Sequence, residues 1–253
     1  MRRDVLELRG FYASALGRAA RELVRRKVDE AWGDARGLDI LGLGYATPFL
    51  DGFPRARRVV AAMPAAQGVE AWPHGARNLA CLMDETALGF PNALFDRILV
   101  VHGLEESDDP LAFLREIWRV LAPSGRVIIV ASSRLGLWSD AEQTPFGHGR
   151  PFSRRQLEEL VREAGLEPLA WSRALYAPPL DWTSGWAEAL EQIGSRLWPQ
   201  FSGLILLEAV KQSFAVKPKA APLRAKRAPG TLRPAPAGRV LEPLRLGRNR
   251  DSA

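Results

Sequence analysis

Short apolar runs alternate with helical patterns through the first 212 residues of this 253-residue chain, and this alternation limits the fold more than any other feature. Strands separated by helices are typical of a mostly parallel sheet that is covered by helices on both faces. The sequence therefore predicts a doubly wound α/β fold with a seven-stranded sheet, whose last elements can close an antiparallel edge. The runs read as strands are residues 38–43, 58–62, 78–83, 95–101, 126–131, 169–176 and 203–210.

The helices between these runs carry their own end signals. Asp109 is placed to cap a helix whose first turn holds Pro110. Ser153 and Gln156 have the spacing of a capping box, and Gly165 ends the helix that follows them. The predicted helices cover residues 8–23, 110–121, 153 to the stop at 165, and 182–198.

Charge divides the chain into a body and a tail. Residues 217–253 hold ten Lys or Arg and two acidic residues, so they contribute +8 to a net charge of +6 and leave −2 on the rest. The tail has six Pro, few large apolar residues and no aromatic residue, a composition that cannot offset the entropy cost of ordering. We therefore expect an N-terminal helical segment at 1–37 that packs on or caps the domain, a main domain at 38–212 and a disordered, basic, Pro-rich tail at 213–253. Nucleic-acid binding by this tail, through phosphate contacts without base stacking, is the alternative to a solvated extension.

The cysteine and histidine counts bear on compartment and metal binding. A single cysteine, Cys81, cannot form an internal disulfide, which is typical of a reducing compartment. The opening residues include Asp4 and Glu7 where a signal peptide needs its apolar core, and no run approaches the roughly 20 apolar residues of a membrane span. We expect a cytoplasmic protein without a membrane partner. Three His and one Cys offer no metal-ligand spacing, so we expect no metal.

The loop after the first predicted strand is the first candidate site. It reads DILGLGYATPFL, and Gly42 and Gly44 allow a tight turn in which a ligand approaches the backbone. Ligands of doubly wound sheets lie beyond the carboxyl ends of the strands, which is where this loop is expected. A tight turn that binds nothing is the alternative interpretation.

Motifs further along the chain make this interpretation more specific. Met83-Asp84-Glu85 precedes a Leu-Gly-Phe-Pro stretch and a Phe-Asp that opens the fourth strand, and that strand ends in Val-His-Gly-Leu-Glu. With the glycine loop and residues 114–125 and 148–157, these segments stand in the order of the class I S-adenosylmethionine-dependent methyltransferases. The chain resembles that family, in particular its type 11 branch, over about residues 38–212. The resemblance implies a Rossmann-like fold and S-adenosylmethionine as cofactor.

The resemblance also assigns roles to individual residues. Gly42 and Gly44 would contact the amino-acid end of the cofactor, and Asp84 would accept a hydrogen bond from the adenine amine. Glu85 would add a backbone contact. His102 at a strand end and His148 in a flexible loop are the candidate catalytic residues, although His102 also suits a buried, satisfied histidine and His148 a lid. The full cofactor set is Gly42, Leu43, Gly44, Tyr45, Met63, Asp84, Glu85, Val101 and His102.

Some positions depart from the family pattern. Ile40 replaces an acidic residue before the glycine loop, and Ala46 replaces the third glycine. Met63 stands where the family has the carboxylate that binds the ribose hydroxyls, and losing such an acceptor costs about 1.5–3 kcal/mol, or roughly ten- to a hundredfold in affinity. Gln67 or Glu70 is available to substitute for it.

Two functions follow as hypotheses. The first is an S-adenosylmethionine-dependent methyltransferase with a divergent cofactor pocket and a small-molecule acceptor, because the body is slightly acidic and carries no basic, aromatic ligand edge. The second is a catalytically inactive protein of the same fold that binds a ligand or a partner. The acidic residues at 105–109 are explained by the positive end of the helix that follows them. The oligomeric state is not indicated.

Overall fold

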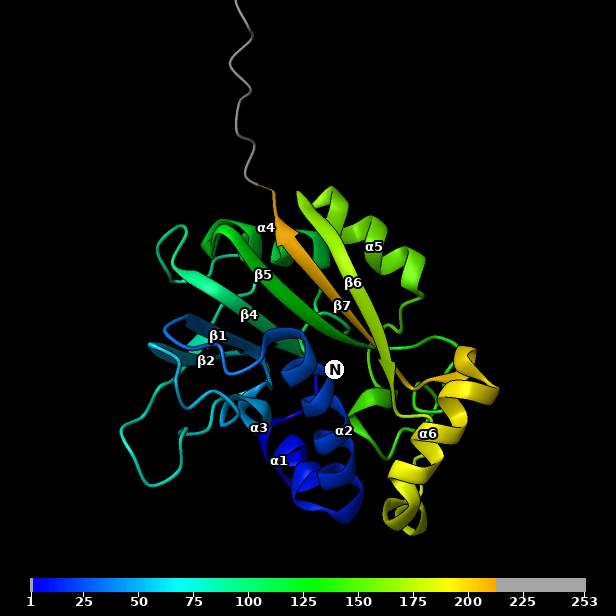
Figure 1. The fold of residues 1–253 in the computed structure, drawn as a ribbon. Coiled ribbons are helices and arrows are strands. Elements are labelled where there is room, and N and C mark those ends of the chain that lie inside the picture. Colours follow the sequence, from blue (N-terminus) through cyan, green and yellow to red (C-terminus); the bar gives the residue numbers. More distant parts are fainter. Residues whose placement is uncertain (1, 213–253) are drawn as a thin grey trace, which may run out of the picture. The chain divides into compact units, whose positions relative to one another are not determined.

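A single seven-stranded sheet organises the computed structural model, which describes residues 2–212 apart from the side chains of residues 181, 182, 184 and 199. The strand order is β3-β2-β1-β4-β5-β7-β6, in which the first five strands are parallel and β7 runs antiparallel to both β5 and β6 (Figure 1). This confirms the predicted sheet and its antiparallel edge. The strands are β1 (Asp39–Gly44), β2 (Arg58–Pro64), β3 (Ala80–Met83), β4 (Phe95–Val101), β5 (Leu121–Ser132), β6 (Leu166–Ala174) and β7 (Leu204–Lys211).

Helices cover both faces of this sheet, as predicted (Figure 1). Successive residues of a strand point to opposite faces, so Ile40 packs in one core cluster with α1, α2 and α3, whereas Leu41 packs in the other with α4 and α5. Burial on both faces explains why the parallel strands read as continuous apolar runs. The helices are α1 (Val5–Ala13), α2 (Ala15–Trp32), α3 (Thr47–Leu50), α4 (Pro110–Val120), α5 (Arg154–Glu163) and α6 (Ala187–Leu197), with 3-10 turns η1 (Pro145–Gly147), η2 (Asp181–Trp186) and η3 (Pro199–Phe201).

The single helix predicted over residues 8–23 is wrong, because the chain breaks at Ser14. This residue has an extended backbone, and its side chain accepts a hydrogen bond from the Gly17 backbone N–H, which makes it the cap of α2. A Cβ at Gly17 would lie 1.9 Å from the Phe11 carbonyl oxygen, so the turn into α2 requires a residue without a side chain. The apolar periodicity continues through the break and therefore hid it.

The fifth strand starts earlier than predicted. It begins at Leu121 and not after Gly125. The extra residues are accommodated by a bulge between two pairs of the β4–β5 ladder, Phe95 with Leu121 and Arg97 with Arg126. Ser124 takes a φ of +60° at this irregularity. Residues 213–253, including the predicted tail, lie outside the described residues.

The capping box of α5 is formed as the sequence predicts. Ser153 Oγ accepts from the Gln156 backbone N–H, and the Gln156 side chain accepts from the Ser153 backbone N–H. We expect Ser153→Ala to lower the free energy of unfolding by about 1 kcal/mol, because the Gln156 backbone N–H loses its acceptor. Urea unfolding measures this. Ser195→Ala, on exposed α6, is the control and should change it by less than about 0.5 kcal/mol; equal effects would contradict the role of the box.

Two absences concern only the part of the chain that the structure describes. None of the helices within residues 2–212 is both long enough and apolar enough to span a bilayer. In the same range, no three His, Cys, Asp or Glu side chains are grouped so that they could hold a metal ion.

Candidate functional site

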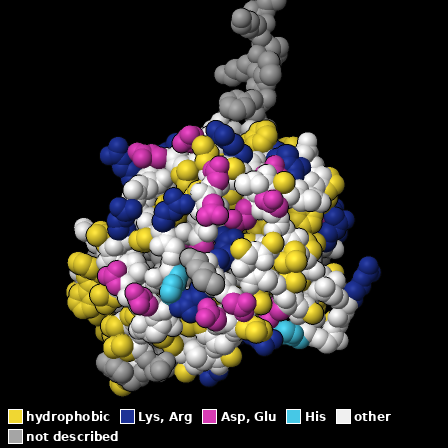
Figure 2. All heavy atoms as spheres, turned by 180° about the vertical axis from the view of Figure 1, so that it is seen from behind, with side chains coloured by type: hydrophobic (Ala, Val, Ile, Leu, Met, Phe, Trp, Pro, Cys, Tyr) yellow, Lys and Arg dark blue, Asp and Glu magenta, His cyan; other side chains and the backbone are white. Residues whose placement is uncertain are grey.

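A cavity of about 840 Å³ opens beyond the carboxyl ends of β2, β3 and β4. This volume lies within the usual range for small-molecule sites, and the position is the one that ligands take in doubly wound sheets. Figure 2 shows Asp and Glu side chains crowded around the middle of the face on which it opens. The lining residues are Arg2, Pro64, Ala65, Ala66, Leu82, Met83, Asp84, Glu85, Thr86, Glu105, Glu106, Ser107, Asp108, Asp109, Gly149 and Arg150.

Asp84 lies exposed at this cavity, directly after β3. Its Oδ1 accepts hydrogen bonds from the Thr86 backbone N–H at 2.8 Å and from the Thr86 hydroxyl at 2.7 Å. These hydrogen bonds to Thr86 lower the pKa of Asp84 below its usual value. The carboxylate is therefore ionised at neutral pH and can accept a hydrogen bond from an amine in the cavity.

Glu85 is paired with the second residue of the chain. Arg2 Nη2 donates to Glu85 Oε1 at 2.6 Å and to the Gly103 carbonyl oxygen at 3.1 Å. Arg2 also forms an ion pair with Glu106, in which Arg2 Nε lies 3.5 Å from Glu106 Oε2. The guanidinium of Arg2, whose side chain is 8% exposed, thus lies between the ends of β3 and β4 inside the cavity.

The glycine loop is buried and does not line the cavity. Gly44 has a φ of +77°, and a Cβ there would lie 2.2 Å from the Val101 carbonyl oxygen. A Cβ at Gly42 would lie 2.7 Å from Leu50, on α3. Both glycines therefore serve close packing of β1 in this structure. Leu43 and Tyr45 are also buried, and the Tyr45 backbone N–H donates to the Val101 carbonyl oxygen at 2.7 Å.

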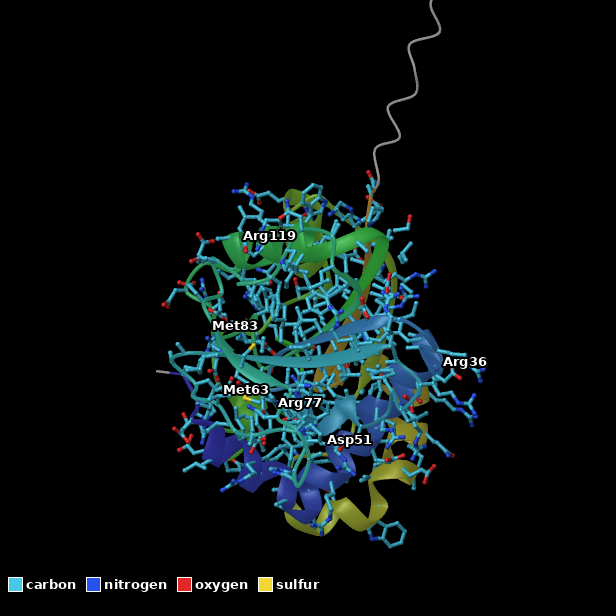
Figure 3. All side chains as sticks on the ribbon, turned by 90° about the vertical axis from the view of Figure 1, so that its left-hand side faces the viewer. Arg36, Asp51, Met63, Arg77, Met83 and Arg119 are labelled. Atoms are coloured by element: carbon cyan, nitrogen blue, oxygen red, sulfur yellow. The ribbon has the colours of Figure 1, made fainter. Side chains whose placement is uncertain are left out.

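Met63 is fully buried and its thioether is only a weak hydrogen-bond acceptor, but two stronger acceptors lie near the glycine loop. Gln67 Nε2 donates to the Gly44 carbonyl oxygen at 3.3 Å, and Gln67 Oε1 is buried without a partner. Glu70 Oε1 accepts from the Tyr45 hydroxyl at 2.8 Å, whereas Glu70 Oε2 is buried without a partner. Two unsatisfied buried acceptors are costly unless a ligand donates to them. Figure 3 shows Met63 near Met83, at the end of the sheet away from Arg36.

The two candidate catalytic histidines both contact the N-terminal segment, His102 as a buried ring and His148 as a half-buried one. His102 has a φ of +51°, and its Nε2 lies 2.8 Å from the Tyr12 hydroxyl of α1. Burial lowers the pKa of His102 to about 3, so the ring is neutral at physiological pH. His148 contacts Arg3 and lies 2.7 Å from the Glu142 carbonyl oxygen. The structure therefore brings both rings against residues 2–13 rather than into the open cavity.

Glu105 is the residue that the sequence interpretation missed. Only Asp109 caps α4, by accepting from the Ala112 backbone N–H at 2.9 Å, so the helix end does not explain the whole acidic run. Glu105 is 3% exposed, and its Oε1 accepts from the Ser132 backbone N–H at 3.1 Å. Burial raises the pKa of Glu105 to about 7. The sequence has four acidic residues before α4, although one is enough to cap the helix. This excess was the signal that could have identified Glu105.

The comparisons with known proteins agree with this geometry. The strand order and the cavity beyond the strand ends define a Rossmann-like α/β protein. A family model described as a methyltransferase domain matches residues 16–170, more than half of the chain. The chain belongs to the class I S-adenosylmethionine-dependent methyltransferases. The predicted family is confirmed, and with it the class of enzyme and the cofactor, S-adenosylmethionine, that characterise this family. The type 11 branch stays a prediction.

Individual relatives are distant. Demethylmenaquinone methyltransferase of Lactococcus lactis subsp. lactis (strain IL1403) is 33% identical over 79 residues, which are 30% of this chain and 31% of that protein. The alignment thus spans about a third of that relative.

Solved structures extend the likeness in fold. A Thermotoga maritima S-adenosylmethionine-dependent methyltransferase has a TM-score of 0.57 at 18% identity, over 82% of this chain and 96% of its own. One from Mesorhizobium loti has a TM-score of 0.54 at 14% identity, over 79% and 99%. The [4+2]-cyclase SpnF has a TM-score of 0.51 at 22% identity, over 74% and 79%. At these identities the likeness shows the fold alone.

Proposed function

We propose that this chain transfers a methyl group from S-adenosylmethionine to a small molecule through a divergent cofactor pocket. The observation that carries the proposal is the cavity at the ends of β2–β4, with an ionised Asp84 exposed at it. The bound cofactor would supply an electrophilic methyl group on a sulfonium, and the chain would have to supply positioning.

One carboxylate in the cavity and two acceptors beside the glycine loop suit the adenosine part of the cofactor. Asp84 is available to the adenine amine. Glu70 Oε2 and Gln67 Oε1, both buried without partners beside the glycine loop, are available to the ribose hydroxyls in place of the carboxylate that Met63 lacks. Glu70 and Gln67 are therefore our assignment for the ribose anchors. Gly42, Gly44, Val101 and His102 remain the expected contacts of the methionine part.

The amino-acid end is covered by the chain itself, and this bears on the alternative function. The Tyr12 hydroxyl is within hydrogen-bond distance of His102 Nε2, and Arg2 donates to the Gly103 carbonyl oxygen. Residues 2–13 would have to move for the methionine part to enter. If they do not, the chain is an inactive member of the family that binds a ligand or partner. The similarity to SpnF, a cyclase, illustrates that this fold also carries other functions.

Calorimetry with S-adenosylmethionine and S-adenosylhomocysteine tests the proposed function. We expect both to bind, and we expect Asp84→Ala to weaken binding at least tenfold, because a charged acceptor is lost. Asp34→Ala, exposed before β1, is the matched control and should bind like the wild type. No heat at millimolar ligand would reject the enzyme and leave the inactive alternative. Unchanged affinity in Asp84→Ala would show that the adenine contact is misassigned.

A further inference from the structure

One part of the cavity is left without a role by the cofactor assignment. It is formed by the segment between β4 and α4, together with Arg150 from the loop before α5. Carboxylates dominate the whole cavity, because Arg2 and Arg150 are its only cationic side chains among the described residues. The acidic lining residues are Asp84, Glu85, Glu105, Glu106, Asp108 and Asp109.

Two buried side-chain oxygen atoms in this segment have no partner. Glu105 and Ser107 are each 3% exposed, and Glu105 Oε2 and Ser107 Oγ are buried without a hydrogen bond. Arg150 does not satisfy either of them. Its Nη2 donates to the Ser107 carbonyl oxygen at 2.7 Å, and its backbone N–H donates to the Glu105 carbonyl oxygen at 2.8 Å. A buried carboxylate oxygen and a buried hydroxyl without partners are strongly disfavoured unless a ligand supplies donors.

The chain already places one cation in this cavity. The Arg2 guanidinium contacts Glu85, Glu106 and the Gly103 carbonyl oxygen, and its side chain is 8% exposed. It reaches the cavity from the N-terminal end of the chain, where only residues 3 and 4 separate it from α1. The cavity therefore accepts an organic cation of this size, and the group in it belongs to a segment that must move if the cofactor's methionine part is to enter.

We propose that this acidic part of the cavity binds a small organic cation, an alkylammonium or a guanidinium, and that this cation is the methyl acceptor. A protonated nitrogen has no free lone pair, so transfer would require Glu105 Oε2 to take one N–H proton. The nitrogen would then form the new N–C bond as the bond between sulfur and the methyl group of S-adenosylmethionine breaks, and S-adenosylhomocysteine would leave. Glu105 Oε2 and Ser107 Oγ accept hydrogen bonds from its N–H groups, and Glu106 supplies charge once Arg2 is displaced. The assignment as acceptor rests on the proposed function, whereas the cation site does not. A neutral or anionic ligand would leave the carboxylates of this site unpaired.

Binding of agmatine, which carries one ammonium and one guanidinium, tests the site on the full chain without cofactor. We expect binding by calorimetry, with 1,4-butanediol as a neutral probe of similar length that does not bind. Glu105→Gln should weaken agmatine binding at least tenfold and Ser107→Ala about threefold. Arg2→Gln should tighten it about fivefold, because the competing cation is removed. Glu163→Gln, exposed on α5, is the matched control and should bind like the wild type.

Each result decides the cation site. Agmatine binding no better than butanediol, or equal affinities in Glu105→Gln and Glu163→Gln, would overturn it. Ser107→Ala provides an independent measurement if Glu105→Gln does not fold.

The cofactor is itself a cation at sulfur, so a second set of titrations separates the two sources of positive charge. If the site holds the acceptor, agmatine and S-adenosylhomocysteine bind together, and each binds in the presence of saturating amounts of the other. If S-adenosylmethionine instead displaces agmatine and binds at least tenfold more tightly than S-adenosylhomocysteine, the carboxylates hold the sulfonium and the acceptor assignment is overturned. Agmatine binding without any cofactor binding would leave the cation site standing and reject the proposed function.

Discussion

His102→Asn should remove a large part of the acid sensitivity of the folded chain. In the folded state burial lowers the pKa of His102 to about 3, whereas the ordinary value is 6.5. The unfolded chain therefore takes up a proton below pH 6.5 that the folded chain does not take up until about pH 3. The stability that the neutral ring contributes is present above pH 6.5 and is lost as the pH falls toward 3.

Urea unfolding at pH 7 and pH 4 measures this effect. We expect the wild type to lose about 3 kcal/mol more than His102→Asn between the two values, by proton linkage from the pKa shift. Asn tolerates the positive φ of this position, so the variant can keep the backbone turn. His74→Asn, at an exposed histidine in the loop between β2 and β3, is the control and should follow the wild type. An equal loss of unfolding free energy in the wild type and both variants would contradict a buried neutral His102.

Glu105→Gln should stabilise the chain at alkaline pH, although it removes a charged residue. Burial raises the pKa of Glu105 from 4.5 to about 7. The folded state therefore holds a proton between pH 4.5 and 7 that the unfolded state has released, so the stability from Glu105 is fully present below pH 4.5 and is lost as the pH rises through 7. Gln has the same shape, does not titrate, and can still accept from the Ser132 backbone N–H.

Unfolding at pH 5 and pH 8 measures the second effect. Relative to the wild type, we expect Glu105→Gln to gain about 3 kcal/mol of stability at pH 8 compared with pH 5. Glu163→Gln serves again as the exposed control. A constant difference between Glu105→Gln and the wild type at both pH values would show that the carboxyl is not forced into its neutral form. A stabilising substitution at a ligand-facing position is the pattern of a residue kept for binding at a cost in stability.

The two titrations oppose each other between pH 4.5 and 6.5. In that window His102 makes the folded state more stable as the pH rises, whereas Glu105 makes it less stable. The free energy of unfolding of the wild type can therefore depend only weakly on pH in this window, although both groups titrate. Only the single variants separate the contributions.

Several parts of the fold could be predicted because their causes are local. β4 coincides with its apolar run from Phe95 to Val101, and the caps at Asp109 and Ser153 form as their spacing requires. The break at Ser14 was missed because the apolar period runs through it and only the packing of Gly17 on Phe11 reveals it. The early start of β5 depends on a bulge, which reflects pairing with β4 and not the sequence of β5 alone.

Some residues of the candidate site could also be placed from the sequence, and others could not. Asp84 and Glu85 follow a strand that its composition predicts, so their place at the cavity could be expected. Glu105 could not be distinguished from its acidic neighbours, because its burial comes from β5 and the loop at residue 149, which are distant in sequence. The Arg2 contact with Glu85 joins residues 83 positions apart, and no local pattern encodes it.

By itself, the sequence determined the alternation of elements, the order of the motifs and the family, because apolar periodicity, caps and motif spacing act over a few residues. Only the tertiary structure decided which of these residues are open to a ligand. Accessibility depends on how distant segments pack, and here Tyr12 of α1 packs on His102 and on Tyr45 of the glycine loop, while an acidic cavity stays open beside Asp84 and Glu105.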